Sequence, residues 1–282
     1  RSIDAVGNES QVLRFNFRNL SPAIMRDMND NISSVVVDEL GLVKAAAVEG
    51  KANNNALQGE EGDNLNGISE MTDAAETQQI TDFFALTNTV APNVCNYTQL
   101  EQQARTLLGN ASARMVYDFD RQPCVVASIA REQHAKQNPN NSPLQISFEY
   151  SDGLGKVTMK KVQAEPGKIK APDGTDIDTG NQLRWVGNGR TVLNNKGNPI
   201  KQYEPYFSTT PAYEDDPAWV EQGVTPIIYY DGTGRNVKTE MPNGTFTKVE
   251  FDAWKQYHYD VNDTVKDSQW YAQRITLADS NP

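Results

Sequence analysis

The sequence predicts a mainly β fold, in which repeated antiparallel β-hairpins form an extended curved sheet with a short helical insertion. Runs of β-branched and aromatic residues recur along most of the 282-residue chain. Short motifs of Asp, Asn, Pro and Gly separate these runs, as is typical of tight turns. Helical patterning is confined to one stretch. We therefore expect β-hairpins at 1–50, a polar loop and two-helix insertion at 51–112, and a longer hairpin array at 113–282.

The clearest hairpins lie at 225–260, which predicts four short strands joined by three tight turns. Residues 231–234 (DGTG) have Asp first and Gly fourth, and residues 241–244 (MPNG) have Pro second and Gly fourth. These are type I turn preferences, because Asp bonds nearby backbone N–H groups, Pro presets φ and Gly relieves the exit. Strands are predicted on either side of these turns, at 226–230, 235–239 and 245–251.

Residues 1–50 predict a first meander of the same kind. Strands are expected at 12–17, 23–26, 32–37 and 42–48. Asp38 and Gly41 repeat the turn spacing of Asp231 and Gly234, with Val37 in the place of Tyr230. This hairpin is therefore interpreted as a degenerate copy of the same unit.

The insertion begins with a polar, Asn- and Gly-rich stretch at 50–67, which predicts a long surface loop. Helices are expected at 73–85 and 99–108. A capping box begins at Thr98, and Gly109 follows the second helix where a terminating glycine belongs. The insertion could be a plug or a docking element, but the simpler interpretation is a side-packed excursion that covers a sheet edge.

Strand patterns resume after the insertion. They predict strands at 114–117, 124–131, 145–150, 157–164, 183–186, 191–193 and 270–277, with loops at 165–182 and 208–223. Tyr117 and Asp118 keep the first two positions of the turn unit without its glycine, whereas Asp152 and Gly155 keep the turn. Residues 187–189 (GNG) predict a hairpin turn between the strands on either side.

The spacing of these turns is irregular. The aligned turn residues are Asp38, Asp118, Asp152, Asn195, Asp231 and Asp252. Repeated hairpins with variable loops fit this spacing better than a solenoid or a propeller of fixed period. Since one hairpin cannot bury a face alone, we expect neighbouring hairpins to pair edge to edge into one sheet.

Bulk properties exclude several classes of partner. The chain has 37 acidic and 26 basic residues, a net charge of −11, and a mean hydropathy of −0.63. This balance opposes binding to nucleic acid or to anionic lipid. No apolar run has the length of a membrane helix. Because the chain opens without an initiator Met or an apolar signal region, we expect an internal piece of a longer polypeptide.

The sequence offers no catalytic constellation, so we expect neither an enzyme nor a cofactor. His134 and His258 lack partners at metal-ligand spacing. Oxygen-bearing residues at 27–31 and at 173–178 could hold Ca²⁺, but Asx-rich turns give the same spacing. Cys95 and Cys124 are interpreted as buried thiols, with a disulfide as the alternative.

The turn unit also carries a resemblance to known proteins. Residues 230–235 (YDGTGR) have the Y-D-x-x-G-R form of YD repeats, the unit of Rhs proteins. Residues 192–208 (VLNNKGNPIKQYEPYFS) and 259–265 (YDVNDTV) resemble stretches of the B component of bacterial Tc insecticidal toxin complexes. The resemblance covers most of the chain, and it is less clear between residues 51 and 110.

The resemblance implies a structural role. In that family, YD-type hairpins coil into a hollow β-shell around a cytotoxic C-terminal segment. Implied partners are the rest of the parent toxin chain, the Rhs-containing C component with its toxin cargo, and the pore-forming A component. The complex is secreted, and neither nucleic acid nor membrane is implied as a partner. The family's autoproteolytic segment finds no match here, so no catalytic residue is carried over.

Two other functions remain open from sequence. One is a YD-repeat surface that binds glycan or protein, and the other is a hydrolase that uses loop carboxylates. Under the structural interpretation, the residues of interest are those of the YD-type turns. They are Asp38, Gly41, Tyr117, Asp118, Asp152, Gly155, Tyr230, Asp231, Gly234 and Arg235. In this unit Asp and Gly are expected to turn the chain, Tyr to pack the sheet, and Arg to bond across strands.

Overall fold

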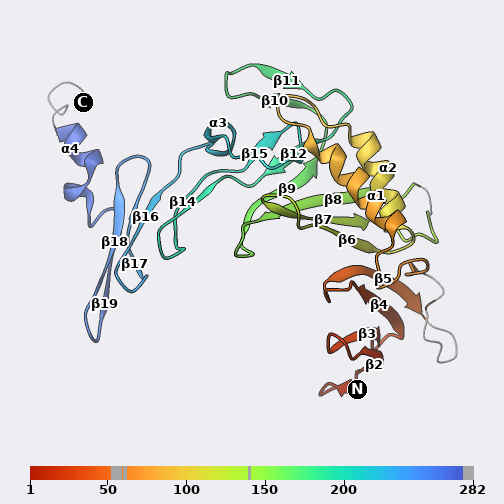
Figure 1. The fold of residues 1–282 in the computed structure, drawn as a ribbon. Coiled ribbons are helices and arrows are strands. Elements are labelled where there is room, and N and C mark those ends of the chain that lie inside the picture. The colour runs from red at the N-terminus through yellow and green to blue at the C-terminus, as the bar shows by residue number, and fades with distance from the viewer. Residues whose placement is uncertain (52–58, 60–61, 139–140, 276–282) are drawn as a thin grey trace. The chain divides into compact units, whose positions relative to one another are not determined.

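The structure is a computed structural model that describes residues 1–51, 59, 62–138 and 141–275. The chain divides into two compact units (Figure 1). Unit 1 contains Arg1–Val186 and Phe207–Tyr213, and unit 2 contains Gly187–Tyr206 and Glu214–Pro282. The predicted division at residues 50 and 112 follows sequence character and stays a prediction.

Unit 1 is built on an eleven-stranded sheet with the strand order β1-β2-β3-β4-β5-β6-β7-β8-β9-β12-β15. The strands are β1 (Ser2–Ile3), β2 (Glu9–Asn16), β3 (Ser21–Arg26), β4 (Asn31–Val37), β5 (Val43–Lys51), β6 (Ala113–Asp118), β7 (Cys124–Arg131), β8 (Leu144–Ser151), β9 (Val157–Ala164), β12 (Arg184–Gly187) and β15 (Tyr206–Ser208). Every pairing from β1 to β9 is antiparallel. The predicted edge-to-edge array of hairpins is confirmed for this unit.

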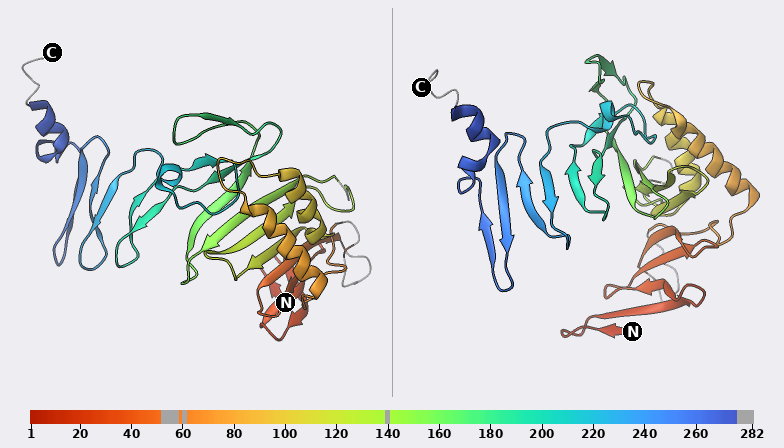
Figure 2. Two further views of the ribbon diagram at one scale, coloured as in Figure 1. Left: turned by 45° about the horizontal axis from the view of Figure 1, so that its top comes forward. Right: turned by 60° about the vertical axis from the view of Figure 1, so that its left-hand side comes forward.

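Two helices follow β5, and β6 then pairs directly with β5. Helix α1 (Ala74–Ala85), with a short 3₁₀ turn η1 (Leu86–Asn88), and helix α2 (Tyr97–Leu108) lie against one face of β6–β9 (Figures 1 and 2). The helices were predicted to cover a sheet edge, and that prediction is wrong. Because β5 and β6 pair with each other, the insertion leaves no gap in the sheet and packs on its face instead.

The start of α2 also differs from its prediction. The helix begins at Tyr97, and the Asn96 side chain accepts a hydrogen bond from Gln99 N at 3.2 Å. Asn96 is therefore the N-cap, and the predicted cap Thr98 lies inside the first turn. Gly109 ends the helix at φ +55°, as its position predicts.

Aromatic rings fill the space between the helices and the sheet. Phe83 of α1 stacks on Phe148 of β8 with ring centroids 6.0 Å apart. Phe148 meets the Trp185 ring edge-on at 5.5 Å. All three side chains are fully buried, so this cluster is the centre of the core of unit 1.

Unit 2 carries the predicted four-stranded meander. Its strands are β16 (Ile227–Tyr230), β17 (Asn236–Glu240), β18 (Phe246–Phe251) and β19 (Gln256–Tyr259), paired antiparallel in that order. A separate hairpin pairs β13 (Thr191–Leu193) with β14 (Pro199–Gln202). Helix α3 (Pro217–Val220), 3₁₀ turn η2 (Val265–Asp267) and helix α4 (Gln269–Ile275) complete the unit.

Several predicted elements are corrected. The GNG motif at 187–189 does not join a hairpin, because β12 pairs in the large sheet while β13 pairs with β14. The loop at 165–182 contains a short hairpin of β10 (Lys168–Lys170) and β11 (Asp176–Asp178). Helix α3 interrupts the loop at 208–223, so helices are not confined to the insertion.

The predicted strand at 270–277 is a helix over its described part. Its start has a local cause, since Ser268 Oγ accepts a hydrogen bond from Tyr271 N at 3.1 Å. A serine in this position satisfies a free N–H of the first turn, which favours a helix over a strand. Leu277 lies outside the described residues.

The predicted surface loop at 50–67 is anchored at its end. Residues 52–58 and 60–61 of this loop lie outside the described part of the chain. Asp63 is 2% exposed, and its carboxylate accepts hydrogen bonds from Ala135 N at 2.5 Å and from the Ser112 hydroxyl. A buried carboxylate needs such partners, and the pattern of polar residues alone did not reveal them.

Candidate functional site

The Asp231 turn shows how the predicted unit is built. Asp231 N donates to Arg235 O at 2.9 Å, and Gly234 N donates to Asp231 O at 3.1 Å. Its side-chain Oδ1 accepts from both Thr233 N and Arg235 N at 2.9 Å. Gly234 has φ +89°, which a residue with a side chain rarely adopts. One carboxylate and one glycine thus close the hairpin.

Five more turns repeat this arrangement within the described residues. In each turn, the backbone N–H of the first residue donates to the carbonyl oxygen of the fifth. The side-chain oxygen of the first residue accepts from the backbone N–H groups of the third and fifth residues. The first residues are Asp4, Asp27, Asp38, Asp152 and Asn194.

The repeated arrangement corrects the alignment of turn residues. Asn194, and not the predicted Asn195, is the turn residue of its hairpin. Asp4 and Asp27 were missing from the predicted alignment. Asp4 has a glycine at the fourth position, so the same spacing rule could have found it. Asp27 has Asp30 there, at φ +64°, a conformation that Asp adopts more readily than most residues. The predicted glycines Gly41 and Gly155 have φ +84° and +77°.

The tyrosines of the unit tie each hairpin to another segment. The hydroxyl of Tyr117 donates to Val43 O, and that of Tyr230 donates to Pro199 O, both at 2.8 Å. Tyr150, two residues before Asp152, donates to Pro211 O at the same distance. Desolvation by burial raises the pKa of Tyr117, with the nearby Asp38 charge adding to it. The tyrosine therefore both packs and bonds across the array.

Asp118 and Arg235 depart from the expected roles. The Asp118 carboxylate accepts from Arg121 Nε at 2.8 Å, and Arg121 also donates to Phe84 O, which ties this turn to α1. Arg235 was expected to bond across strands. Its ion pair with Asp231 at 2.7 Å instead stays within the turn. Its contact across strands is with the Phe251 ring, whose centroid lies 4.1 Å from the guanidinium carbon.

The strand register of β6–β9 sorts their side chains onto two different faces. On the helix-covered face every side chain of three rows is at most 4% exposed. The rows are Arg114, Ile129 and Ile146; Val116, Ala127, Phe148 and Lys161; and Val125, Tyr150 and Met159. The helix-covered face of β6–β9 therefore forms part of the core of unit 1.

The opposite face of β6–β9 stays open. Its rows are Ala113, Ala130 and Gln145; Met115, Ser128, Ser147 and Val162; and Tyr117, Val126, Glu149 and Lys160. None of these residues is buried, and Glu149 pairs with Lys160 at 2.6 Å. Small and polar side chains dominate, with single apolar residues between them. The open face therefore lacks a large apolar patch of its own.

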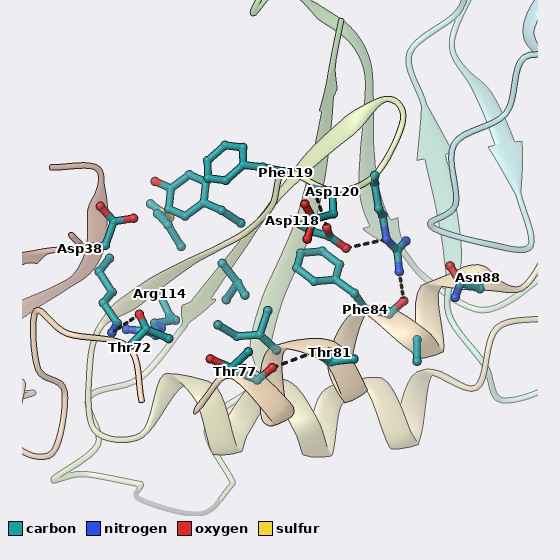
Figure 3. A pocket seen from close by; sticks show the side chains of 17 residues that line it. Asp38, Thr72, Thr77, Thr81, Phe84, Asn88, Arg114, Asp118, Phe119 and Asp120 are labelled. Carbon is teal, nitrogen blue, oxygen red and sulfur yellow. Dashed lines mark hydrogen bonds and ion pairs between the residues drawn. The ribbon is translucent and has the colours of Figure 1, made fainter. Parts of the chain in front are cut away.

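A cavity of about 600 Å³ lies along α1, between this helix and the β6–β7 hairpin (Figure 3). Thr77, Thr81 and Phe84 face it from α1, and Phe119 faces it from the hairpin. Arg114 and Lys44 also line it. Both cations pair with the carboxylate of Glu76, Lys44 at 2.8 Å. Sequence reasoning missed this cluster, because its members come from three elements that are distant in the chain.

The two histidines and the two cysteines lie in separate parts of the fold. His134 Nδ1 lies 3.1 Å from the Asp63 carboxylate, and His258 is on the exposed strand β19. Cys95 and Cys124 are both free, the first buried and the second half-buried, and burial raises the pKa of Cys95 to about 11. Over the described residues no group of three or more His, Cys, Asp or Glu could hold a metal ion.

Among the described residues, no helix is both long enough and apolar enough to span a membrane.

Comparison with known proteins gives matches among solved structures alone. Neither a family model nor a curated protein matches the sequence. A crystal structure of TcdB2-TccC3 matches with a TM-score of 0.62 and 22% identity, over 94% of this chain and 12% of that chain. The Photorhabdus luminescens Tc holotoxin pore matches with a TM-score of 0.59 and 19% identity, over 94% of this chain and 14% of that chain.

This chain has the fold of a segment of those Tc toxin chains. A third structure, TcdB2-TccC3-Cdc42, agrees with a TM-score of 0.57 and 22% identity, again over 94% of this chain and 14% of that one. The mainly β fold of repeated antiparallel hairpins, predicted from the hairpin pattern, is confirmed. At these identities the likeness establishes fold, and the chain spans only 12% to 14% of the length of the toxin chains.

Proposed function

We propose that this chain is a section of a YD/Rhs-type shell, in the B component of a secreted bacterial toxin complex, that encloses a cytotoxic polypeptide before delivery. The observation that carries the proposal is the pair of unlike faces on strands β6–β9 of unit 1. One face is sealed by helices and aromatic residues, while the other is open and mostly small and polar. The fold shared with Tc toxin chains supports the same assignment.

The open face suits the wall of a container. An unfolded polypeptide exposes apolar side chains, and a wall with large apolar patches would hold them by the hydrophobic effect. Ser128 and Ser147 lie directly opposite each other on this face. Such small hydroxyl-bearing residues give a chain little to adhere to, so a cargo would stay releasable.

The long sheet keeps most of its strands away from its two edges, β1 and β15. Unpaired strand edges invite pairing with another chain, which a container of unfolded protein must avoid. From β2 to β9 every strand has a neighbour on both sides. In this role the chain acts without catalytic residues or a cofactor. Its partners would be the rest of the parent chain, the C component with its cargo, and the pore-forming A component.

The test places a new apolar patch on the open face of the chain in its parent toxin complex. Complexes with the native face should protect the cargo from added protease and release it on delivery. The double substitution Ser128→Leu and Ser147→Leu should keep this protection and slow the release, measured by cargo translocation. Thr98→Leu, on the exposed side of α2, serves as the control. Cargo that is digested equally with and without the complex would contradict an enclosing role.

A binding surface for glycan or protein is a second candidate, favoured by aromatic exposure in unit 2. Trp254, in the β18–β19 turn, is 93% exposed, and Tyr257 is 45% exposed. Exposed aromatic rings can stack on sugars. Binding of a glycan that Trp254→Ala removes would support this function, and binding that survives the substitution would count against it.

A further inference from the structure

The cavity beside α1 contains a buried arginine whose hydrogen bonds are incomplete. The Arg114 side chain is 2% exposed, and its Nη2 pairs with the Glu76 carboxylate. Its Nε and Nη1 are buried and have no hydrogen-bond partner. Buried donors are almost always paired, and an unpaired one is costly, more so on a charged group. Two guanidinium nitrogens of Arg114 therefore lack an acceptor.

The acidic side chains near Arg114 already have other partners. Glu76 is shared between Arg114 and Lys44. The Asp38 charge favours the protonated guanidinium, but desolvation is the larger influence and lowers the pKa of Arg114. Asp38 Oδ1 also serves its own turn by accepting from Leu40 N and Leu42 N. An additional anionic acceptor would therefore stabilise the buried cation.

Arg121, the other arginine of the cavity, is not available for a ligand in the same way. It donates to the Asp118 carboxylate at 2.8 Å, to Thr87 Oγ1 at 3.0 Å and to Phe84 O at 2.6 Å. These bonds hold the β6–β7 turn against α1. An anion that enters the cavity is thus directed to Arg114.

The walls of the cavity combine polar and charged side chains, Asp118 and Asp120 among them, with apolar and aromatic ones. Ile80 and Phe84 come from α1, while Tyr117 and Phe119 stack on each other with centroids 5.6 Å apart and planes at 9°. Phe119 is 56% exposed, so it borders the open side (Figure 3). A cavity volume of about 600 Å³ falls in the range that holds small organic ligands.

We propose that this cavity binds a carboxylate carried on an apolar or aromatic body. The carboxylate accepts from the unpaired N–H groups of Arg114, and the body packs against Phe84 and Phe119. Nε and Nη1 are shielded from water in the present conformation. Binding therefore includes a turn of the guanidinium toward the ligand while its pair with Glu76 is kept or exchanged.

Two sources can supply this chemistry, a free organic acid or an acidic side chain in a peptide segment. The probes are 3-phenylpropionate, its amide 3-phenylpropionamide, the capped tripeptide Leu-Glu-Phe, and the same tripeptide with Gln in place of Glu. Each is titrated into the full chain by isothermal calorimetry. We expect saturable binding of at least one carboxylate probe, with its neutral counterpart about 10-fold or more weaker, since a charge-assisted bond is lost. The tighter of the two carboxylates identifies the source.

Variants separate binding from folding. Arg114→Met should weaken the carboxylate by about 10-fold or more and make it equal to the amide. Because loss of Arg114 could disturb the fold, Thr81→Trp provides an independent test. Thr81 is exposed and lines the cavity, so a tryptophan there should block binding and leave the Arg114–Glu76 pair intact. Gln78→Trp, exposed on α1 outside the cavity, should bind like the native chain.

Three results would each overturn the proposal. One is the absence of saturable binding by every probe. Another is equal affinity for carboxylate and neutral counterpart in the native chain. The third is binding that Thr81→Trp does not change, which would place the ligand elsewhere.

Discussion

At the scale of single residues, one side chain determines each hairpin turn. The Asp231 carboxylate accepts hydrogen bonds from the backbone N–H groups and the side chains of Thr233 and Arg235. The neutral amide oxygen of Asn194 accepts the two corresponding backbone bonds of its own turn. The turn therefore requires an oxygen on a short side chain at its first position, and it does not require the negative charge of Asp. Hydrogen bonds to the ionised form, that of the Thr233 hydroxyl first, hold the pKa of Asp231 well below its ordinary value.

This difference predicts a pH effect. The folded-state pKa of Asp231 is depressed, so its contribution to stability is fully present above the unfolded-state pKa near 3.8. That contribution is lost as pH falls below this value toward the folded-state pKa. Asp231→Asn should therefore retain the turn, as Asn194 does, and flatten the loss of stability between about pH 4 and pH 2.

Urea unfolding of unit 2, followed across this pH range, measures the effect. Asp215→Asn serves as a matched control, because Asp215 lies in a loop outside the repeated turns. An unchanged pH slope in the Asp231→Asn protein would show that the carboxylate bonds do not persist in solution.

At the scale of elements, short-range caps decide where the helices begin. Asp73 caps α1 by accepting from Glu76 N at 2.8 Å, and Asn96 caps α2 by accepting from Gln99 N. Thr98 matched the pattern of a capping box, yet it lies inside the helix. Local patterns found both helices, but two capping residues only two positions apart, Asn96 and Thr98, gave two possible starts for α2, and the sequence did not distinguish them.

The two possible starts give different mutational results. Asn96→Ala should lower the free energy of unfolding by about 1 kcal/mol, the usual cost of losing an N-cap. Thr98→Ala should cost less, because Ala is at least as favourable as Thr within a helix. Chemical denaturation followed by circular dichroism compares the two. A larger loss for Thr98→Ala than for Asn96→Ala would contradict the start seen in the structure.

At the scale of the whole molecule, apolar burial is unevenly divided between the two units. Of the buried apolar residues, only Tyr206 and Val220 belong to unit 2 among the residues described. The remainder lie in unit 1. Unit 2 relies on turns, tyrosine bonds and cation–ring contacts such as that of Lys238 with Phe246 at 4.5 Å. Since burial is the main stabilising effect, unit 2 should open more easily.

Hydrogen exchange tests this difference. Backbone amides of β7 and β8 should exchange at least about 10-fold more slowly than those of β17 and β18, although both pairs are central in their sheets. The unfolding of the chain should accordingly depart from a single two-state transition. Equal protection of the two sheets would show that unit 2 gains stability from interactions other than its own core.

The sequence was most informative where structure depends on near neighbours. Asp38, Asp152 and Asp231 each signal a turn because their oxygens reach N–H groups two and four residues ahead. The strands between the turns followed from β-branched and aromatic runs. Predictions failed at Trp270 and at residues 187–189, where a short pattern fits two structures and the choice depends on a partner.

The sequence by itself determined the hairpins, their turns and the two main helices, because these depend on side chains only a few residues apart. Tertiary structure alone decided that β12 joins the large sheet, that α1 and α2 cover a face, and that Lys44, Glu76 and Arg114 meet around one cavity. Such pairings join residues tens of positions apart. They are chosen by which surfaces can be buried together, a property of the assembled chain that no local pattern records.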